Sequence, residues 1–246
     1  MDILYIATLL VAFISSILSG IAGGGGGFVM APYWLITGMT PAQGATTGAF
    51  MATGMSMSSL AAFHRTGHFP KNKKLLYILS TAAFIASILG AVIVPKIDID
   101  AFKTALAFIT IAALPLLFTR PNSTHRSSRH KRYGLFCAIT FLTAGSIITG
   151  SAFSILFTLT LMTSFNMSVL QVTAFRRLVG IVQSTVLFTA FAVQGYFVWQ
   201  HAILGFIGGS VGSYLGTRYA VKKGESYARY ALAAMSIAGA IGLLTL

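Results

Sequence analysis

Residues 20–33 read Gly-Ile-Ala-Gly-Gly-Gly-Gly-Gly-Phe-Val-Met-Ala-Pro-Tyr, and this stretch decides the fold. The chain around it is 56% hydrophobic and only 9% charged, which is typical of a membrane protein. Five consecutive glycines do not form a stable helix interior, because each costs about 1 kcal/mol relative to alanine. Non-helical backbone at membrane depth is tolerated only inside the protein or beside a watery cavity. The glycines therefore predict an elbow that lines a cavity, and close helix packing at small residues is the alternative.

The composition excludes an ordinary soluble domain. The 246 residues include 17 Lys or Arg but only four Asp or Glu, which gives a formal net charge of +13. About 20 apolar residues cross a bilayer as a helix, so the chain could form about eight such segments. The basic residues cluster in short loops, a membrane pattern rather than a nucleic-acid-binding face, and the lone Cys137 excludes a thiolate metal site. We therefore predict an all-α membrane protein, a polytopic helical bundle with no metal site and no nucleic-acid partner.

Glycine, proline and charged residues divide the chain into ten apolar runs. Two of the runs, 28–36 and 153–165, would span only about 14 Å and about 20 Å as helices. Both lengths fall short of a hydrocarbon core about 30 Å thick, so we expect half-helices or re-entrant arms there. The ten runs are 3–22, 28–36, 42–63, 74–94, 101–118, 133–148, 153–165, 169–194, 201–221 and 228–246.

An internal repeat emerges when the chain is compared with itself at an offset of 128 residues. Gln43 then falls on Gln171, and the turn 67–69 falls on the turn 195–197. In both copies the short apolar segment, the turn, the long apolar segment and the end of the copy fall at matching positions, although few residues are identical. The chain is therefore predicted to hold two homologous repeats, residues 1–118 and 129–246, joined by a basic cytoplasmic linker at 119–128.

The loop charges predict how the repeats are oriented. Lys and Arg cluster in the stretches 64–74, 119–132 and 218–229, which the positive-inside rule places in the cytoplasm. The loop 195–200 has no charge and offers aromatic residues for the outer interface, yet it corresponds to the basic loop 67–72. Equivalent loops on opposite faces indicate inverted repeats, each with a re-entrant hairpin and three full crossings. The alternative is four plain crossings in each copy, which gives parallel repeats.

Three stretches also carry a family resemblance. They are the glycine-rich stretch from Gly20 to Pro32, Gly-Met-Thr-Pro-Ala-Gln at 38–43 and Arg-Thr-Gly-His-Phe at 65–69. In these elements the chain resembles the TauE/SafE family of sulfite and organosulfur anion exporters. The resemblance implies secondary transport of small sulfur-containing oxyanions, such as sulfite, sulfoacetate or other sulfonates, across the inner membrane and without a cofactor. Family members often repeat a glycine-rich element in the second half, where this chain has Thr-Gly-Ser-Ala-Phe-Ser at 149–154, so the Ser151 hydroxyl could replace a backbone amide.

The candidate site combines the elbow with polar residues of two long helices. Backbone amides at the elbow and the start of the following half-helix favour a negative charge. Thr40-Pro41 and Ser168 are N-cap signals, and each is followed three residues later by a glutamine. If both helices start within the membrane, their positive ends face each other across the repeat axis. Ordinary packing of small and polar residues between helices is the alternative for their glutamines and threonines.

Arg176 and Arg177 are the hardest residues to explain by packing. They stand about 12 Å into the helix that begins after Ser168, where an arginine costs about 2.5–3.5 kcal/mol. No acidic residue lies in an apolar run to pair with them, so an anion from solution is the natural partner, whereas snorkelling to the interface is the alternative. The predicted substrate-binding residues are Gly24, Gly25, Gly26, Gln43, Thr46, Thr47, Ser151, Gln171, Thr173, Arg176 and Arg177.

Other classes of function fit the sequence less well. A membrane hydrolase would need a paired Asp, a Ser with its base or a His-rich metal site, and the sequence assembles none of these, so no enzymatic activity is expected. A non-transporting membrane scaffold or binding subunit would not need arginines beside a glycine-broken helix. We therefore predict a secondary transporter of small oxyanions. The resemblance implies export, whereas the residues themselves leave the direction, the coupling ion and the oligomeric state open.

Overall fold

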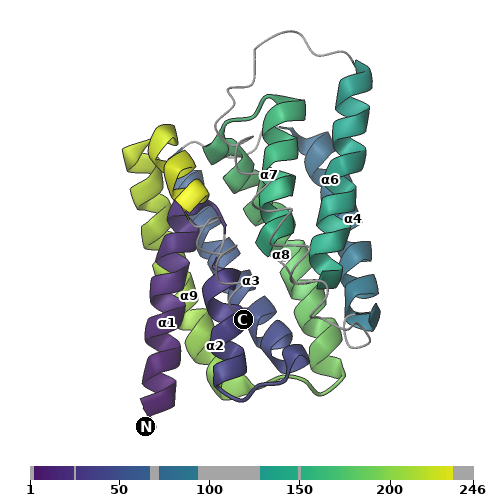
Figure 1. Ribbon diagram of the computed structural model, residues 1–246. Helices are drawn as coiled ribbons and strands as arrows, with labels where there is room; N and C mark the ends of the chain where they lie inside the picture. The colour runs from purple at the N-terminus through teal and green to yellow at the C-terminus, as the bar shows by residue number, and fades with distance from the viewer. Residues whose placement is uncertain (1–2, 25, 67–71, 94–127, 149–150, 235–246) are drawn as a thin grey trace.

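The computed structural model describes residues 3–24, 26–66, 72–93, 128–148 and 151–234, and the regular structure within these ranges is α-helical (Figure 1). The all-α prediction is therefore confirmed for this part of the chain. The run 101–118 and most of the linker 119–128 lie outside the described residues. The helices are α1 (Ile3–Ala22), α2 (Gly27–Ile36), α3 (Pro41–Arg65), α4 (Lys73–Ile93), α6 (Ser128–Ile148), α7 (Ser151–Phe165), α8 (Val169–Val193) and α9 (Trp199–Lys223), and residues 225–234 are also helical.

The helix bounds follow the apolar runs closely, with one instructive difference. α1 covers the run 3–22, and α2 and α7 are the two short arms that the sequence predicts. α6 begins at Ser128, five residues before its apolar run, because the basic residues at 129–132 are also helical. A charged cluster ends an apolar run where the bilayer ends, but lysine and arginine are good helix formers and the helix continues beyond it.

Several helices are suited to a bilayer. α1, α4 and α8 are long and apolar enough to cross a membrane, and Leu156–Phe165 is a shorter apolar helix. α3 and α9 have 25 residues each, but they are less apolar because glycine, serine and threonine line the faces that meet other helices. Their length of about 37 Å exceeds the hydrocarbon core.

α3 and α8 cross in the middle of the bundle and run antiparallel (Figure 1). The hydroxyl oxygens of Thr53 and Ser184 lie 2.9 Å apart at this crossing. On one side of that contact the rings of Phe50 and Phe188 have centroids 4.8 Å apart. On the other side Ser56 approaches Gly180, so residue numbers rise in α3 as they fall in α8.

α1 and α9 lie parallel and unusually close together. Gly208, Gly212 and Gly216 of α9 face the carbonyl oxygens of Leu9, Phe13 and Ile17, where no Cβ could be placed without overlap. α3 packs on another face of α9 and also runs parallel to it. On the other side of the bundle, α4 packs against α8, and α6 packs against α4 and α7 (Figure 1).

Matching capping boxes begin the two central helices. Thr40 Oγ1 accepts from the backbone N–H of Gln43, whose side-chain oxygen accepts from the N–H of Thr40, and Ser168 and Gln171 repeat the pattern. The sequence predicts both starts, since a capping box is local. Because α3 and α8 are antiparallel, the two starts lie at opposite ends of the bundle. The expectation that they face each other is therefore wrong.

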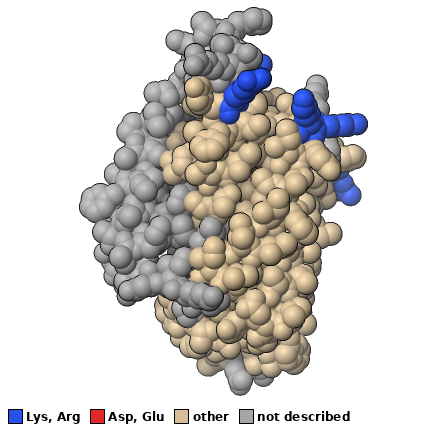
Figure 2. Space-filling model, turned by 90° about the vertical axis from the view of Figure 1, so that its right-hand side faces the viewer, with Lys and Arg blue, Asp and Glu red and all other residues tan. Residues whose placement is uncertain are grey.

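The charged residues gather at one end of the molecule. Figure 2 shows Lys and Arg side chains near the upper end of the visible face, with none on its lower half. α3 and α9 end there, and α4 and α6 begin there (Figure 1). The loop between α8 and α9, which includes 195–198, lies at the opposite end. Among the residues whose exposure the structure describes, the exposed basic ones are Arg65, Lys73, Lys74, Lys131, Arg132, Arg218, Lys222 and Lys223.

Candidate functional site

The glycine run breaks the chain between α1 and α2. α1 ends at Ala22, Gly23 adopts a left-handed conformation with φ of +73°, and α2 begins at Gly27. Gly24 and Gly26 are buried, and Gly25 lies outside the described residues. The carbonyl oxygen of Gly26 accepts from the N–H groups of the first turn of α2, at 3.1 and 3.2 Å. The predicted elbow is therefore present, and it lies inside the protein.

Arg176 of α8 reaches the elbow. Its Nη1 donates to the carbonyl oxygen of Gly23 at 2.8 Å and to Thr158 Oγ1 of α7 at 3.0 Å. A Cβ placed on Gly24 would lie 2.8 Å from the same nitrogen. The absence of a side chain at Gly24 thus makes room for the guanidinium.

Arg177 binds the last turn of α1. Its Nη2 donates to the carbonyl oxygen of Ser19 at 3.1 Å and lies 3.4 Å from Ser19 Oγ. Its Nε is buried and has no hydrogen-bond partner. The side chain is only 9% exposed, which argues against snorkelling to the interface.

Within the described part of the chain, carbonyl and hydroxyl oxygens meet the two guanidiniums. Both guanidiniums lie at the C-terminal end of α1, where the helix dipole favours positive charge. Among the residues that the structure describes, Glu225 is the one carboxylate, and it accepts from the N–H of Val169 at 3.2 Å and lies 3.6 Å from Arg229. The described part of the protein therefore places no carboxylate against Arg176 or Arg177.

The structure brings some predicted residues together and keeps others apart. Thr173 packs against Gly23, so the elbow, Thr173 and the two arginines form one cluster, which we call the arginine site. Gln43 and Gln171 lie at opposite ends of the bundle and their side-chain oxygens serve the capping boxes. The Thr46 hydroxyl donates to the carbonyl oxygen of Ala42 at 2.7 Å, and the Thr47 hydroxyl is buried with no partner. Ser151 begins α7, and its side chain lies outside the described part of the molecule.

Two residues of the arginine site escape prediction from the sequence. Ser19 supplies two acceptors to Arg177, and Thr158 supplies one to Arg176. Ser19 had a signal, because Ser15, Ser16 and Ser19 recur at helical spacing in an otherwise apolar helix, and all three are buried. Thr158 had none, since threonines are frequent along α7.

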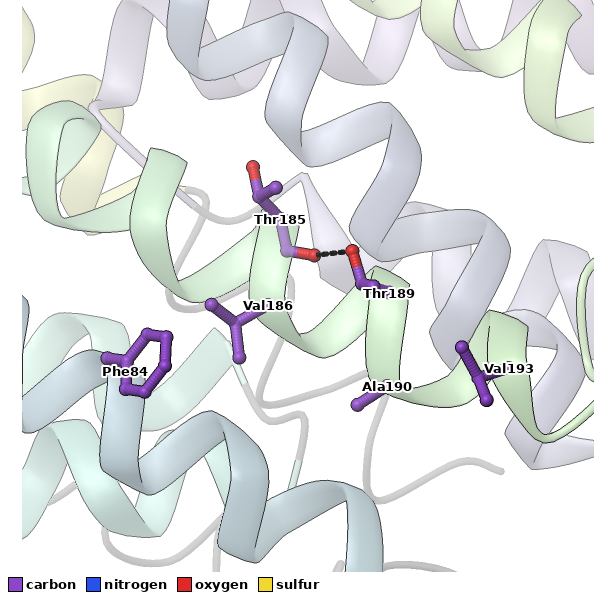
Figure 3. Close-up of a pocket in the computed structure, with 6 residues that line it drawn as sticks. All are labelled: Phe84, Thr185, Val186, Thr189, Ala190 and Val193. Atoms are coloured by element: carbon purple, nitrogen blue, oxygen red, sulfur yellow. Dashed lines mark hydrogen bonds between the residues drawn. The ribbon is translucent and has the colours of Figure 1, made fainter.

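A groove on the surface is a poor candidate for an anion. It has a volume of about 420 Å³ and lies between α4 and α8 (Figure 3). Its lining is apolar apart from two threonines, and Thr189 Oγ1 already donates to the carbonyl oxygen of Thr185 at 2.8 Å. The residues around it are Phe84, Thr185, Val186, Thr189, Ala190 and Val193.

Comparisons with known proteins agree with this architecture. Residues 8–243 match the family described as Sulfite exporter TauE/SafE. The chain is 30% identical to a probable membrane transporter protein, ORF9, of a Sinorhizobium species, over 98% of this chain and 91% of that protein. It is 26% identical to a probable membrane transporter protein of Haemophilus influenzae, over 92% of this chain and 89% of that protein.

A plant relative is also similar in part. The sulfite exporter TauE/SafE family protein 5 of Arabidopsis thaliana is 29% identical over 108 residues, which are 44% of this chain and 24% of that protein. No solved structure matches the chain. The apolar helices and the match over nearly the whole sequence establish that this multi-pass membrane protein belongs to the TauE/SafE family of membrane transporters.

Proposed function

We propose that this protein exports small sulfur-containing oxyanions, such as sulfite, sulfoacetate or other sulfonates, across the inner membrane. The observation that carries this proposal is the pair of arginines at the glycine elbow, one of them with a buried Nε that has no hydrogen-bond partner. A guanidinium offers paired N–H donors whose geometry matches two oxygens of a sulfonate or sulfite. The bound anion would also neutralise the charge of Arg177, which Ser19 meets with uncharged oxygens.

The elbow supplies a second source of attraction for an anion. The N-terminus of α2 has no side-chain cap, so backbone N–H groups at its start are available in addition to the guanidiniums. Gly24 carries no side chain that would cover the approach to Arg176. Gly24, Gly25, Gly26, Thr173, Arg176 and Arg177 are therefore our proposed substrate-binding residues at this site.

We further propose that the chain consists of two inverted repeats, 1–118 and 129–246. The offset of 128 residues superimposes the bounds of α3 on those of α8, and these two helices are antiparallel. The helix contacts also occur in pairs that the offset interchanges, which supports the same division. The pairs are α1·α2 with α6·α7, α2·α3 with α7·α8, α3·α9 with α4·α8, and α1·α9 with α4·α6.

The membrane potential supports export. The end that carries the exposed Lys and Arg would face the cytoplasm by the positive-inside rule. The membrane potential, negative inside, drives an anion outward by about 2.3 kcal/mol per charge and 100 mV. The described helices hold no carboxylate apart from Glu225 near the basic end, so we favour transport driven by the anion gradient and the potential.

The proposal is tested by measuring the thermal unfolding of the purified protein with a panel of anions. Sulfite, sulfoacetate and methanesulfonate should raise the midpoint more than chloride at equal ionic strength, because a ligand that binds only the folded state stabilises it. Arg177→Gln should remove this increment, whereas Arg218→Gln, a change at an exposed arginine of α9, should keep it. If no oxyanion differs from chloride, the arginines serve only to hold α1, as a non-transporting scaffold would require.

A further inference from the structure

A second pair of buried donors lies away from the arginine site. Trp34 of α2 is 2% exposed and Thr47 of α3 is fully buried. Trp34 Nε1 and Thr47 Oγ1 have no hydrogen-bond partner, although an unpaired buried donor destabilises the folded state. Such a group in a native protein calls for an explanation, and a bound ion is one.

The indole of Trp34 lies along a glycine face of α3. A Cβ on Gly44 would lie 3.0 Å from the Cβ of Trp34, and the far edge of the ring lies 3.6 Å from a Cβ on Gly205 of α9. Apart from neighbouring residues of α3 itself, Trp34 Nε1 is the described atom that a Cβ on Gly48 would meet, at 3.5 Å. The indole nitrogen therefore lies beside the bare backbone of Gly48, and Thr47 is the residue immediately before Gly48 in α3.

Gly48 in α3 occupies the position that corresponds to Arg176 in α8, and these two helices are antiparallel. Gly48 comes seven residues after the start of α3, and Arg176 comes seven residues after the start of α8. Both lie about 10 Å from the start of their helix, and the two starts are at opposite ends of the bundle. Where α8 presents a charged guanidinium near the basic end, α3 presents glycine and a hydroxyl beside the indole N–H of α2, towards the opposite end.

We propose that Trp34 Nε1 and Thr47 Oγ1 form a second binding station for the transported oxyanion, which we call the outer station. This inference rests on the proposed function and adds a release step to it. One anion oxygen accepts from the indole N–H and another accepts from the hydroxyl. Because hydrogen bonds from neutral donors are weaker than those from a guanidinium, an anion leaves the outer station more readily than the arginine site.

The surroundings of Trp34 indicate which oxyanions fit. Buried methionines pack with Trp34 and Ala12 in one apolar cluster. Methionine side chains are flexible and adapt to apolar groups of different shape. The outer station is therefore suited to an organosulfonate, whose oxygens meet the two donors while its alkyl part meets the thioethers. The methionines are Met30, Met39, Met51 and Met55.

The tryptophan content makes the outer station measurable. The chain has two tryptophans, and the other one, Trp199, is 59% exposed. In the Trp199→Phe variant the tryptophan emission, excited where tyrosine does not absorb, comes from Trp34 alone. Titration with methanesulfonate should then change the emission in a saturable way, because an indole that donates a hydrogen bond emits at longer wavelength. Gly48→Ala in the same background should abolish the change, since its methyl group lies in ordinary contact with Nε1 and blocks the approach.

Transport provides the second readout. Trp34→Phe and Thr47→Val should each lower methanesulfonate efflux from loaded proteoliposomes about tenfold, the loss expected for one hydrogen bond to a charged group. Ser210→Ala is the matched control, because Ser210 Oγ of α9 is also buried without a partner but lies beside Gly54, more than one turn further along α3 than Gly48, and its efflux should equal wild type.

The outcomes separate the two proposals. If methanesulfonate stabilises the wild type and Arg177→Gln removes that effect, the arginine site holds. If the emission of Trp34 then stays constant and Trp34→Phe transports like wild type, the outer station is overturned while the proposed function stands. If methanesulfonate neither stabilises the protein nor leaves the proteoliposomes, the proposed function fails first.

Discussion

Arg177 Nη2 donates to the carbonyl oxygen of Ser19 at 3.1 Å, and this bond joins the middle of α8 to the last turn of α1. The bond leaves Nε of the same guanidinium buried and unpaired. One edge of the side chain thus holds the last turn of α1, while the N–H at Nε has no protein partner. A structural role and a binding role are therefore compatible in Arg177, and they can be separated by substitution.

Substitution of Arg177 should affect anion binding more than folding. Arg177→Lys keeps the charge but loses the paired donors, so affinity for sulfite should fall about tenfold. Arg177→Gln removes the charge and should bring binding below detection. Anion affinity from thermal shift and efflux from proteoliposomes check both variants. If both variants bind and transport like wild type, the guanidinium serves only to cap α1.

Substitution of Gly24 should disturb Arg176 without a change in charge. In Gly24→Ala the new methyl group would lie 2.8 Å from Arg176 Nη1 and must displace it. We expect transport to fall about tenfold, since the guanidinium loses its position relative to the elbow. Gly205→Ala is the control, because its Cβ would meet its neighbours at 3.6 Å, an ordinary contact distance. Equal transport by the two variants would contradict a substrate role for the elbow.

The topology of the loops is accessible to cysteine labelling. In a Cys137→Ser background, cysteines replace Lys73 at the start of α4 and Trp199 at the start of α9, both of which are exposed. A membrane-impermeant thiol reagent should label Trp199→Cys in intact cells and Lys73→Cys only after the cells are opened, because the two starts lie at opposite ends of the bundle. Equal labelling of both in intact cells would rule out inverted repeats.

The sequence predicts those features that depend on neighbouring residues. Thr40 and Gln43 specify the start of α3 within four positions, and the consecutive glycines specify the elbow in the same local way. The contact between Arg177 and Ser19 joins residues 158 positions apart, and it depends on how several helices pack. Local signals do not encode such a contact. They also mislead about Gln43 and Gln171, whose shared pattern suggests a shared site although antiparallel packing separates them.

The close approach of α1 and α9 should control the stability of the arginine site. A Cβ on Gly212 would overlap the carbonyl oxygen of Phe13, and a Cβ on Gly216 would overlap that of Ile17. Gly212→Leu should therefore force the helices apart and destabilise the protein by about 3 kcal/mol or more, at the upper end of the cost of overpacking. Ile207→Ala in the same helix is the control, because Ile207 is 50% exposed and its loss should cost much less.

Anion binding should respond to the same change. The carbonyl oxygens of Ser19 in α1 and of Gly23, just after α1, accept hydrogen bonds from the two arginines. A displaced α1 therefore moves the elbow away from α8. Thermal unfolding in detergent and the stabilisation by methanesulfonate are measured on the same samples. We expect Gly212→Leu to lose both stability and the methanesulfonate increment, and Ile207→Ala to keep the increment. A Gly212→Leu protein with the wild-type midpoint would show that α1 and α9 do not need this close contact. A destabilised protein with the full increment would show that the anion site does not depend on the position of α1.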